Sequence, residues 1–167
     1  MKRMFWAATL VATLCLALAA PVAAADPSRP FGGHDRVVDT FVTPTTCPAG
    51  ALWRYVGTGT GVFLHLGNAT VSLTHCTFVD FASGTGTFGP GTVTLTAANG
   101  DELHLVHSGA FSLVMTPDGL ASVFDMTWVV AGGTGRFAGA TGAGATHGSS
   151  LLSTGTTAAS YEGEIAY

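Results

Sequence analysis

The side chains of this sequence best suited to proton transfer or metal binding are six histidines, His34, His65, His75, His104, His107 and His147. Histidine serves both chemistries because its pKa lies near neutrality. His104 and His107 are three residues apart, so on a strand they point to opposite faces and cannot share a metal ion. No spacing typical of a metal site occurs elsewhere, and we expect neither a metal nor an organic cofactor.

Two of these histidines lie on predicted strands with an apolar residue on the same face. We expect that one of His65 and His75 points into the interior of the fold and forms a binding site for a small hydrophobic molecule. The other residues expected around it are Phe63, Phe124 and Trp128. The alternative is a hydrogen-bonded histidine with only a structural role.

The carboxylates at the end of the chain offer a second spacing of chemical interest. Glu162 and Glu164 share one face of the last predicted strand, as a general acid and base could. The opposite face carries Tyr161, Ile165 and Tyr167. Because the apolar face should be buried, we expect both glutamates to lie in water.

Asp125 interrupts an otherwise apolar predicted strand. We expect it to form a structural ion pair with Arg54 or Arg136, and a catalytic acid is the alternative. The sequence contains no nucleophile elbow, phosphate loop or zinc-binding spacing, so no catalytic residue can be assigned.

Residues 1–25 have the features of a secretory signal peptide. Two basic residues precede an apolar run, and three alanines precede Asp26. We expect cleavage after Ala25 and secretion of the mature chain, with a membrane anchor as the alternative. Without the signal, the chain has four basic and ten acidic residues, which gives a formal charge of −6. Such a surface argues against nucleic acid and anionic lipid as partners.

Cys47 and Cys76 are the cysteines that remain once Cys15 leaves with the signal. An even number of cysteines in an exported protein predicts a disulfide. Thiol catalysis and metal binding are the alternatives, but neither cysteine belongs to a C-x-x-C motif.

A glycine pattern after residue 132 resembles a dinucleotide fingerprint, with Gly133, Gly135 and Ala138 at the matching positions. That motif requires a helix directly afterwards and an acidic residue about 20 positions further on. The residues that follow, 139–148, show no helical apolar spacing. We therefore exclude nucleotide binding.

The rest of the chain shows only strand signals. Short runs of β-branched and aromatic residues alternate with polar ones and end at turns such as Asn99-Gly100 and 117–119. About eight strands in consecutive hairpins predict an all-β domain, a single antiparallel up-and-down β-barrel over residues 36–167. A β-sandwich is the alternative. Residues 26–35 are expected to form a flexible lead-in, and Gly57, Gly59 and Gly61 to bend or bulge a strand.

The segment GGTGRFAGATG, residues 132–142, resembles the turn signature of the allene oxide cyclase and dirigent superfamily, particularly its secreted bacterial barrel-like members. The His65-Leu66-Gly67 stretch and the Asn99-Gly100-Asp101 turn are similar to those members too. The resemblance implies an eight-stranded barrel whose bore can hold a hydrophobic small molecule. It also implies that an activity would be a cyclisation, isomerisation or guided coupling without a cofactor.

Two classes of function stay open. The first is a secreted barrel that binds a small hydrophobic molecule or acts structurally, without catalysis. The second is a cofactor-free cyclase or isomerase, or a dirigent-like protein, acting on a hydrophobic substrate. A filled bore favours a structural role, whereas an open pocket with converging His, Asp or Tyr groups favours the second class.

Overall fold

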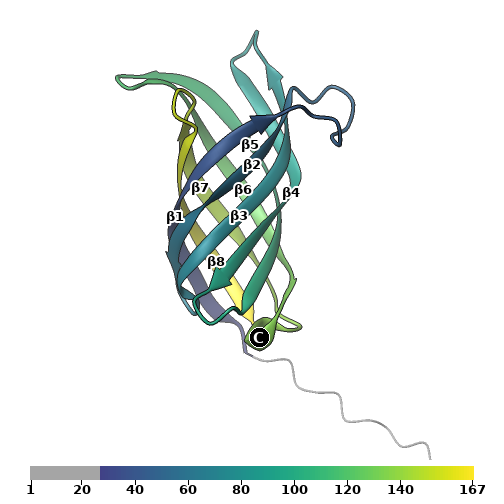
Figure 1. Cartoon of the computed structure of the whole chain (residues 1–167), viewed down its shortest axis with the longest axis vertical. Helices are drawn as coiled ribbons and strands as arrows, with labels where there is room; N and C mark the ends of the chain where they lie inside the picture. The colour runs from purple at the N-terminus through teal and green to yellow at the C-terminus, as the bar shows by residue number, and fades with distance from the viewer. Residues whose placement is uncertain (1–26) are drawn as a thin grey trace, which may run out of the picture.

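The computed structural model describes residues 27–167, which form a closed antiparallel barrel of eight strands (Figure 1). Each strand pairs with its neighbours in the chain, and the last strand pairs with the first. The strands are β1 (Arg29–Val42), β2 (Trp53–Phe63), β3 (Gly67–Asp80), β4 (Thr85–Ala97), β5 (Glu102–Thr116), β6 (Gly119–Gly133), β7 (Thr141–Leu151) and β8 (Thr156–Ala166). The predicted up-and-down barrel is confirmed, and the sandwich alternative is wrong.

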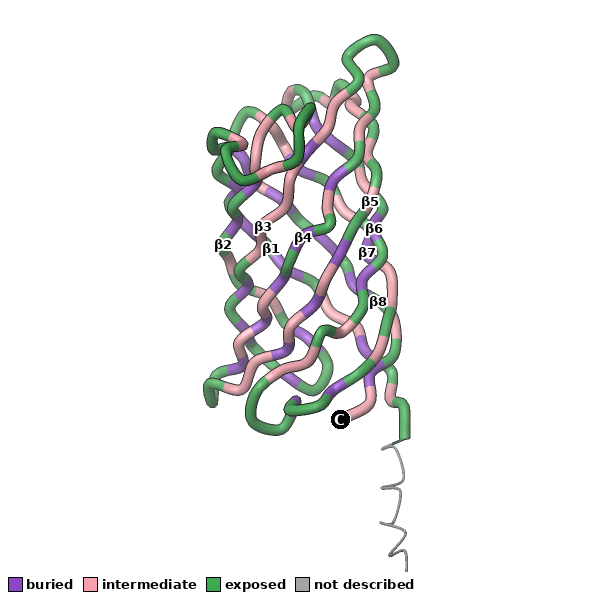
Figure 2. The backbone as a smooth tube through the Cα atoms, turned by 90° about the vertical axis from the view of Figure 1, so that its right-hand side faces the viewer, coloured by how far each residue is buried: buried purple, intermediate pink, exposed green. Residues whose placement is uncertain are grey.

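Successive side chains along each strand point alternately into the bore and toward solvent. Buried and exposed residues alternate along most strands (Figure 2), as a sheet with one face in the bore and one in solvent requires. The predicted hairpin at Asn99-Gly100 joins β4 to β5, where Gly100 has a φ of +88° that favours glycine. Among residues 27–167, no helix has the length and apolar character needed to cross a membrane. The predicted signal peptide lies outside the described residues.

Strand β1 begins seven residues earlier than expected. Residues 29–35 pair with β8 and, from Gly33 onward, with β2, so they form part of the barrel wall and not a flexible lead-in. Phe31 anchors this segment, because its ring is 2% exposed and packs between Phe63 and Trp128. The prolines and glycines of the segment obscured a strand that barrel closure stabilises.

The three glycines of β2 do not bulge the strand. The pairing of β2 with β1 and β3 is continuous from residue 54 to 63. A Cβ atom on Gly57 would lie 2.7 Å from Val37 Cγ1, and one on Gly59 would lie 2.7 Å from Val37 Cα. These glycines therefore leave room for inward side chains of β1, and no bulge occurs at them. The register shifts occur instead where β4 pairs with β3 and β5, and where β6 pairs with β5.

Buried side chains fill one half of the bore. This half lies toward the end of the barrel where the chain terminates, marked C in Figure 1. The 3₁₀ turn η1 (Gly135–Phe137) closes this end with the fully buried ring of Phe137. Above it lies Trp128, whose indole N–H donates to the carbonyl oxygen of Ala145 at 3.1 Å. A Cβ atom on Gly163 would lie 2.7 Å from the indole, so the small residues of β7 and β8 make space for this ring. We call this part of the bore the filled half.

Candidate ligand-binding site

The other half of the bore holds a cavity of about 190 Å³. Its wall is mainly apolar and includes Leu73, Phe88, Val93 and Met126. We call this part the open half. An apolar cavity of about 150 Å³ is enough to bind benzene in another protein, so the volume here suits a molecule built on one aromatic ring.

The predicted site residues divide between the two halves. His75 and Phe124 line the cavity, as expected. Phe63 and Trp128 do not, because they are packed in the hydrophobic core of the filled half. Both side chains are buried, but they do not line the cavity that His75 lines. Their height along the barrel, which depends on strand tilt and register, separates them from His75.

His65 lies in the turn after β2 and is exposed. Its φ of 69° places it in the left-handed region, where the strand alternation no longer applies. The Nε2 atom is 2.9 Å from the carbonyl oxygen of Pro30, and the ring packs edge-on against Tyr167. His65 therefore does not point into the bore, and its contacts are those of a hydrogen-bonded histidine at the barrel end.

His75 forms a pair with His107, whose place in the site was not predicted. The Nδ1 atom of His75 is 3.1 Å from Nε2 of His107, so one ring donates to the other. Tyr55 stacks on His75 from one side and Phe88 packs against it from the other, with ring centroids 4.8 and 4.7 Å away. Burial lowers the pKa of His75 to about 3, helped by the proximity of His107, and lowers that of His107 to about 4. Both rings are therefore neutral at pH 7.

Two buried carboxylates of β1 also line the cavity. Asp35 accepts a hydrogen bond from the Tyr161 hydroxyl at 3.0 Å, and Asp39 accepts one from the Thr157 hydroxyl. Burial raises the pKa of Asp35 to about 6 and raises that of Asp39 as well. Burial and the nearby charge of Asp35 raise the pKa of Tyr161. Asp35 was missed because its segment was taken for a lead-in, although the alternation of Asp35, Val37 and Asp39 would have shown one inward face.

The alternation predicted for the other polar groups holds. His104 is 40% exposed on the outer wall, whereas His107 is 3% exposed in the bore, so the two do point to opposite faces. Glu162 and Glu164 face solvent, while Tyr161 and Ile165, which flank them in sequence, are buried. The glutamates are not part of the cavity.

Asp125 does not pair with an arginine. It lies on the outer wall and accepts a hydrogen bond from Nδ1 of His147, and this bond raises the pKa of the histidine. Arg136 instead lies 3.5 Å from Asp101, and Arg54 donates to threonine hydroxyls. The predicted pairing is wrong because β6 and β7 place Asp125 directly opposite His147.

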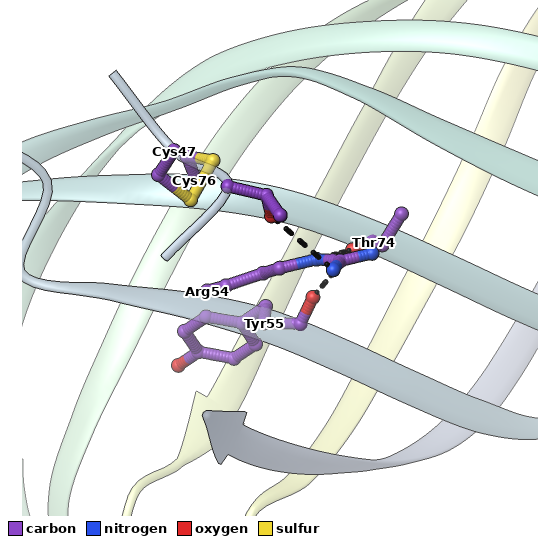
Figure 3. The surroundings of a disulfide bond; sticks show 6 residues. Cys47, Arg54, Tyr55, Thr74 and Cys76 are labelled. Atoms are coloured by element: carbon purple, nitrogen blue, oxygen red, sulfur yellow. Dashed lines mark hydrogen bonds between the residues drawn. A yellow bond between two sulfur atoms is a disulfide. The ribbon is translucent and has the colours of Figure 1, made fainter. Parts of the chain in front are cut away.

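The disulfide between Cys47 and Cys76 is confirmed, and it joins the loop after β1 to the middle of β3 across a Cα separation of 5.7 Å (Figure 3). Arg54 lies beside it and donates to Thr74 Oγ1 at 2.9 Å. Trp53, which follows this loop, lines the cavity. The disulfide therefore fixes one wall of the cavity mouth.

The open half combines an apolar wall with a few polar groups that could orient a ligand or move a proton. Within residues 27–167, no group of three or more His, Cys, Asp or Glu side chains is arranged to hold a metal ion. Comparisons with protein-family models, curated proteins and solved structures found no match to this chain.

Proposed function

We propose that this protein binds a small hydrophobic molecule in the open half of its barrel. The observation that supports this most strongly is the 190 Å³ cavity with a predominantly apolar wall. Water gains few hydrogen bonds against such a wall, so its displacement by an apolar ligand is favourable. The ligand's size is limited to about one aromatic ring with a short substituent.

The cavity mouth supports the same proposal. Phe81 and Leu120 line the cavity and are also exposed, so apolar surface continues from the interior to the rim. Met115 near this rim is 78% exposed. A hydrophobic molecule can thus enter the bore along apolar side chains, in keeping with the role expected of small-molecule barrels.

A pair of neighbouring serines on β7 allows a matched test. Ser150 is buried and lines the cavity, whereas Ser149 is exposed on the outer wall. We expect Ser150→Phe to weaken binding of 2-phenylethanol at least tenfold, because the new ring occupies the ligand's space, while Ser149→Phe leaves it unchanged. Isothermal titration calorimetry measures both. Equal binding by the two variants would place the ligand elsewhere, and a wild-type protein that binds no small aromatic molecule would exclude the proposal.

A cofactor-free cyclase or isomerase is the second candidate. It is favoured by the convergence of two carboxylates, two tyrosines and two neutral histidines on one apolar cavity, since such groups can donate and accept protons. The resemblance to the allene oxide cyclase and dirigent superfamily points the same way. The candidates differ in what leaves the protein: a binding protein releases its ligand unchanged, and an isomerase releases a compound of equal mass and different chromatographic retention.

We further propose that the protein is secreted after removal of residues 1–25. The disulfide supports this, because disulfides persist in oxidising compartments. The protein recovered from the culture medium of its host is expected to have the intact mass of a chain that begins at Asp26 and contains no free thiol. Recovery of the uncleaved chain from inside the cell would contradict the proposal.

A further inference from the structure

The open half of the bore carries acidic groups and no permanently basic ones. Asp35 and Asp39 are 3% and 8% exposed, and both line the cavity. None of the described residues that line it is a lysine or an arginine. The other titratable groups that line the cavity are His75, His107 and two tyrosines. Neither histidine is cationic at pH 7, because both pKa values lie well below neutrality. His34, next to Asp35 in sequence, does not line this cavity.

Each carboxylate uses one oxygen and leaves the other unpaired. The Oδ2 atom of Asp35 accepts from Tyr161, and that of Asp39 accepts from Thr157. Among residues 27–167, neither Oδ1 atom has a hydrogen-bond partner. A buried acceptor without a donor is costly, and more so when it is charged. The two oxygens therefore favour a ligand that brings donors.

Further unpaired polar atoms surround the same space. Thr77 Oγ1 and His107 Nδ1 belong to cavity-lining side chains that are 3% exposed, and neither atom has a partner among the described residues. Gly57 lies next to the Oδ1 atom of Asp39, and a Cβ atom on residue 57 would collide with that oxygen. The strand β2 thus leaves room for this carboxylate to stand in the bore near the mouth.

We propose that the ligand of this cavity is a hydrophobic amine, bound with its ammonium group on Asp39 and its apolar body against the wall. This inference rests on the proposed binding function and names the chemical class of the ligand. An ammonium group supplies both the missing donors and the missing positive charge. Asp35, deeper along β1, contributes its negative charge.

Three probes that share a phenyl ring and differ in head group test the proposal. Calorimetric titrations at pH 7.5 would compare 2-phenylethylamine, 2-phenylethanol and 3-phenylpropanoate with the wild-type protein. We expect the amine to bind at least tenfold more tightly than the alcohol, and the carboxylate to bind most weakly. The preference for the amine should shrink at pH 5, where Asp35 with a pKa of about 6 is mostly protonated.

The variant Asp39→Asn keeps the shape of the side chain and its ability to accept from Thr157. We expect the amine's affinity for this variant to lie within about threefold of the alcohol's affinity for the same variant. Asp35→Asn, which tests the deeper charge independently, should reduce the amine preference less. If the protein binds the alcohol but does not prefer the amine, the inference about the ligand class is wrong and the binding function stands. An amine preference that is unchanged in both variants has the same consequence. Failure of all three probes to bind would overturn the binding function itself.

Discussion

Replacing both Cys47 and Cys76 by serine is expected to lower the free energy of unfolding by about 3 to 4 kcal/mol. The disulfide joins residues 29 positions apart in sequence, and the chain-entropy cost of closing a loop of that length gives this magnitude. For a domain of this size the melting temperature should fall by roughly 10 to 15 °C. Chemical denaturation followed by circular dichroism measures the change.

The natural control is the wild-type protein unfolded in the presence of a reducing agent, which should behave as the double variant does. A loss below about 1 kcal/mol would show that the cross-link adds little. Because the disulfide fixes the loop that leads into Trp53, we also expect the double variant to bind 2-phenylethanol more weakly at temperatures where it is still folded.

His107 is expected to make stability depend strongly on acid pH. Its pKa is about 4 in the folded protein and near its ordinary 6.5 when unfolded, because burial penalises the charged ring. Between these values the unfolded chain binds more protons, so stability falls as the pH falls. Above pH 6.5 the ring is neutral in both states, so His107 does not destabilise the fold. As the pH falls toward 4, its destabilising effect grows. From pH 7 to 4 the loss should be about 2 to 3 kcal/mol.

The substitution His107→Asn removes this effect, because asparagine keeps hydrogen-bonding capacity and does not titrate. It also removes the part of the pKa shift of His75 that comes from His107, so the variant loses less stability in acid on both counts. Asp35 acts in the opposite direction, since its raised pKa of about 6 makes its contribution fall as the pH rises from 4 to 6. This opposing effect is present in both proteins and cancels in their comparison. Urea denaturation at several pH values should show the stability of wild type falling more steeply than that of the variant. Parallel pH profiles would contradict the account.

The sequence predicted the barrel because period-two alternation and turn residues are local properties. The Asn99-Gly100 hairpin, the outward glutamates and the inward Tyr161 all follow from them. The disulfide followed from the number of cysteines and the predicted compartment. His75 was identified from the period-two alternation, since its strand has a clear inward face.

The rest of the site depends on long-range strand pairing and on position along the barrel axis, which local sequence patterns do not indicate. Asp35 lies in a segment rich in proline and glycine that becomes a strand by pairing with β8 and β2, and the pairing with β8 joins the two ends of the chain. Phe63 and Trp128 face inward as predicted, but strand tilt places them in the filled half. His65 leaves the predicted pattern because its backbone turns at a positive φ. Long-range closure and position along the barrel axis therefore decide which inward residues share a cavity.

The most direct test of a half-filled, ligand-binding barrel is a methyl NMR titration with 2-phenylethanol. The account predicts that shifts are confined to methyl groups of the open half, such as those of Leu73, Val93 and Met126. Methyl groups of the filled half, such as those of Leu103 and Ile165, should remain unchanged. Shifts spread over the outer wall, or none at millimolar probe, would contradict it.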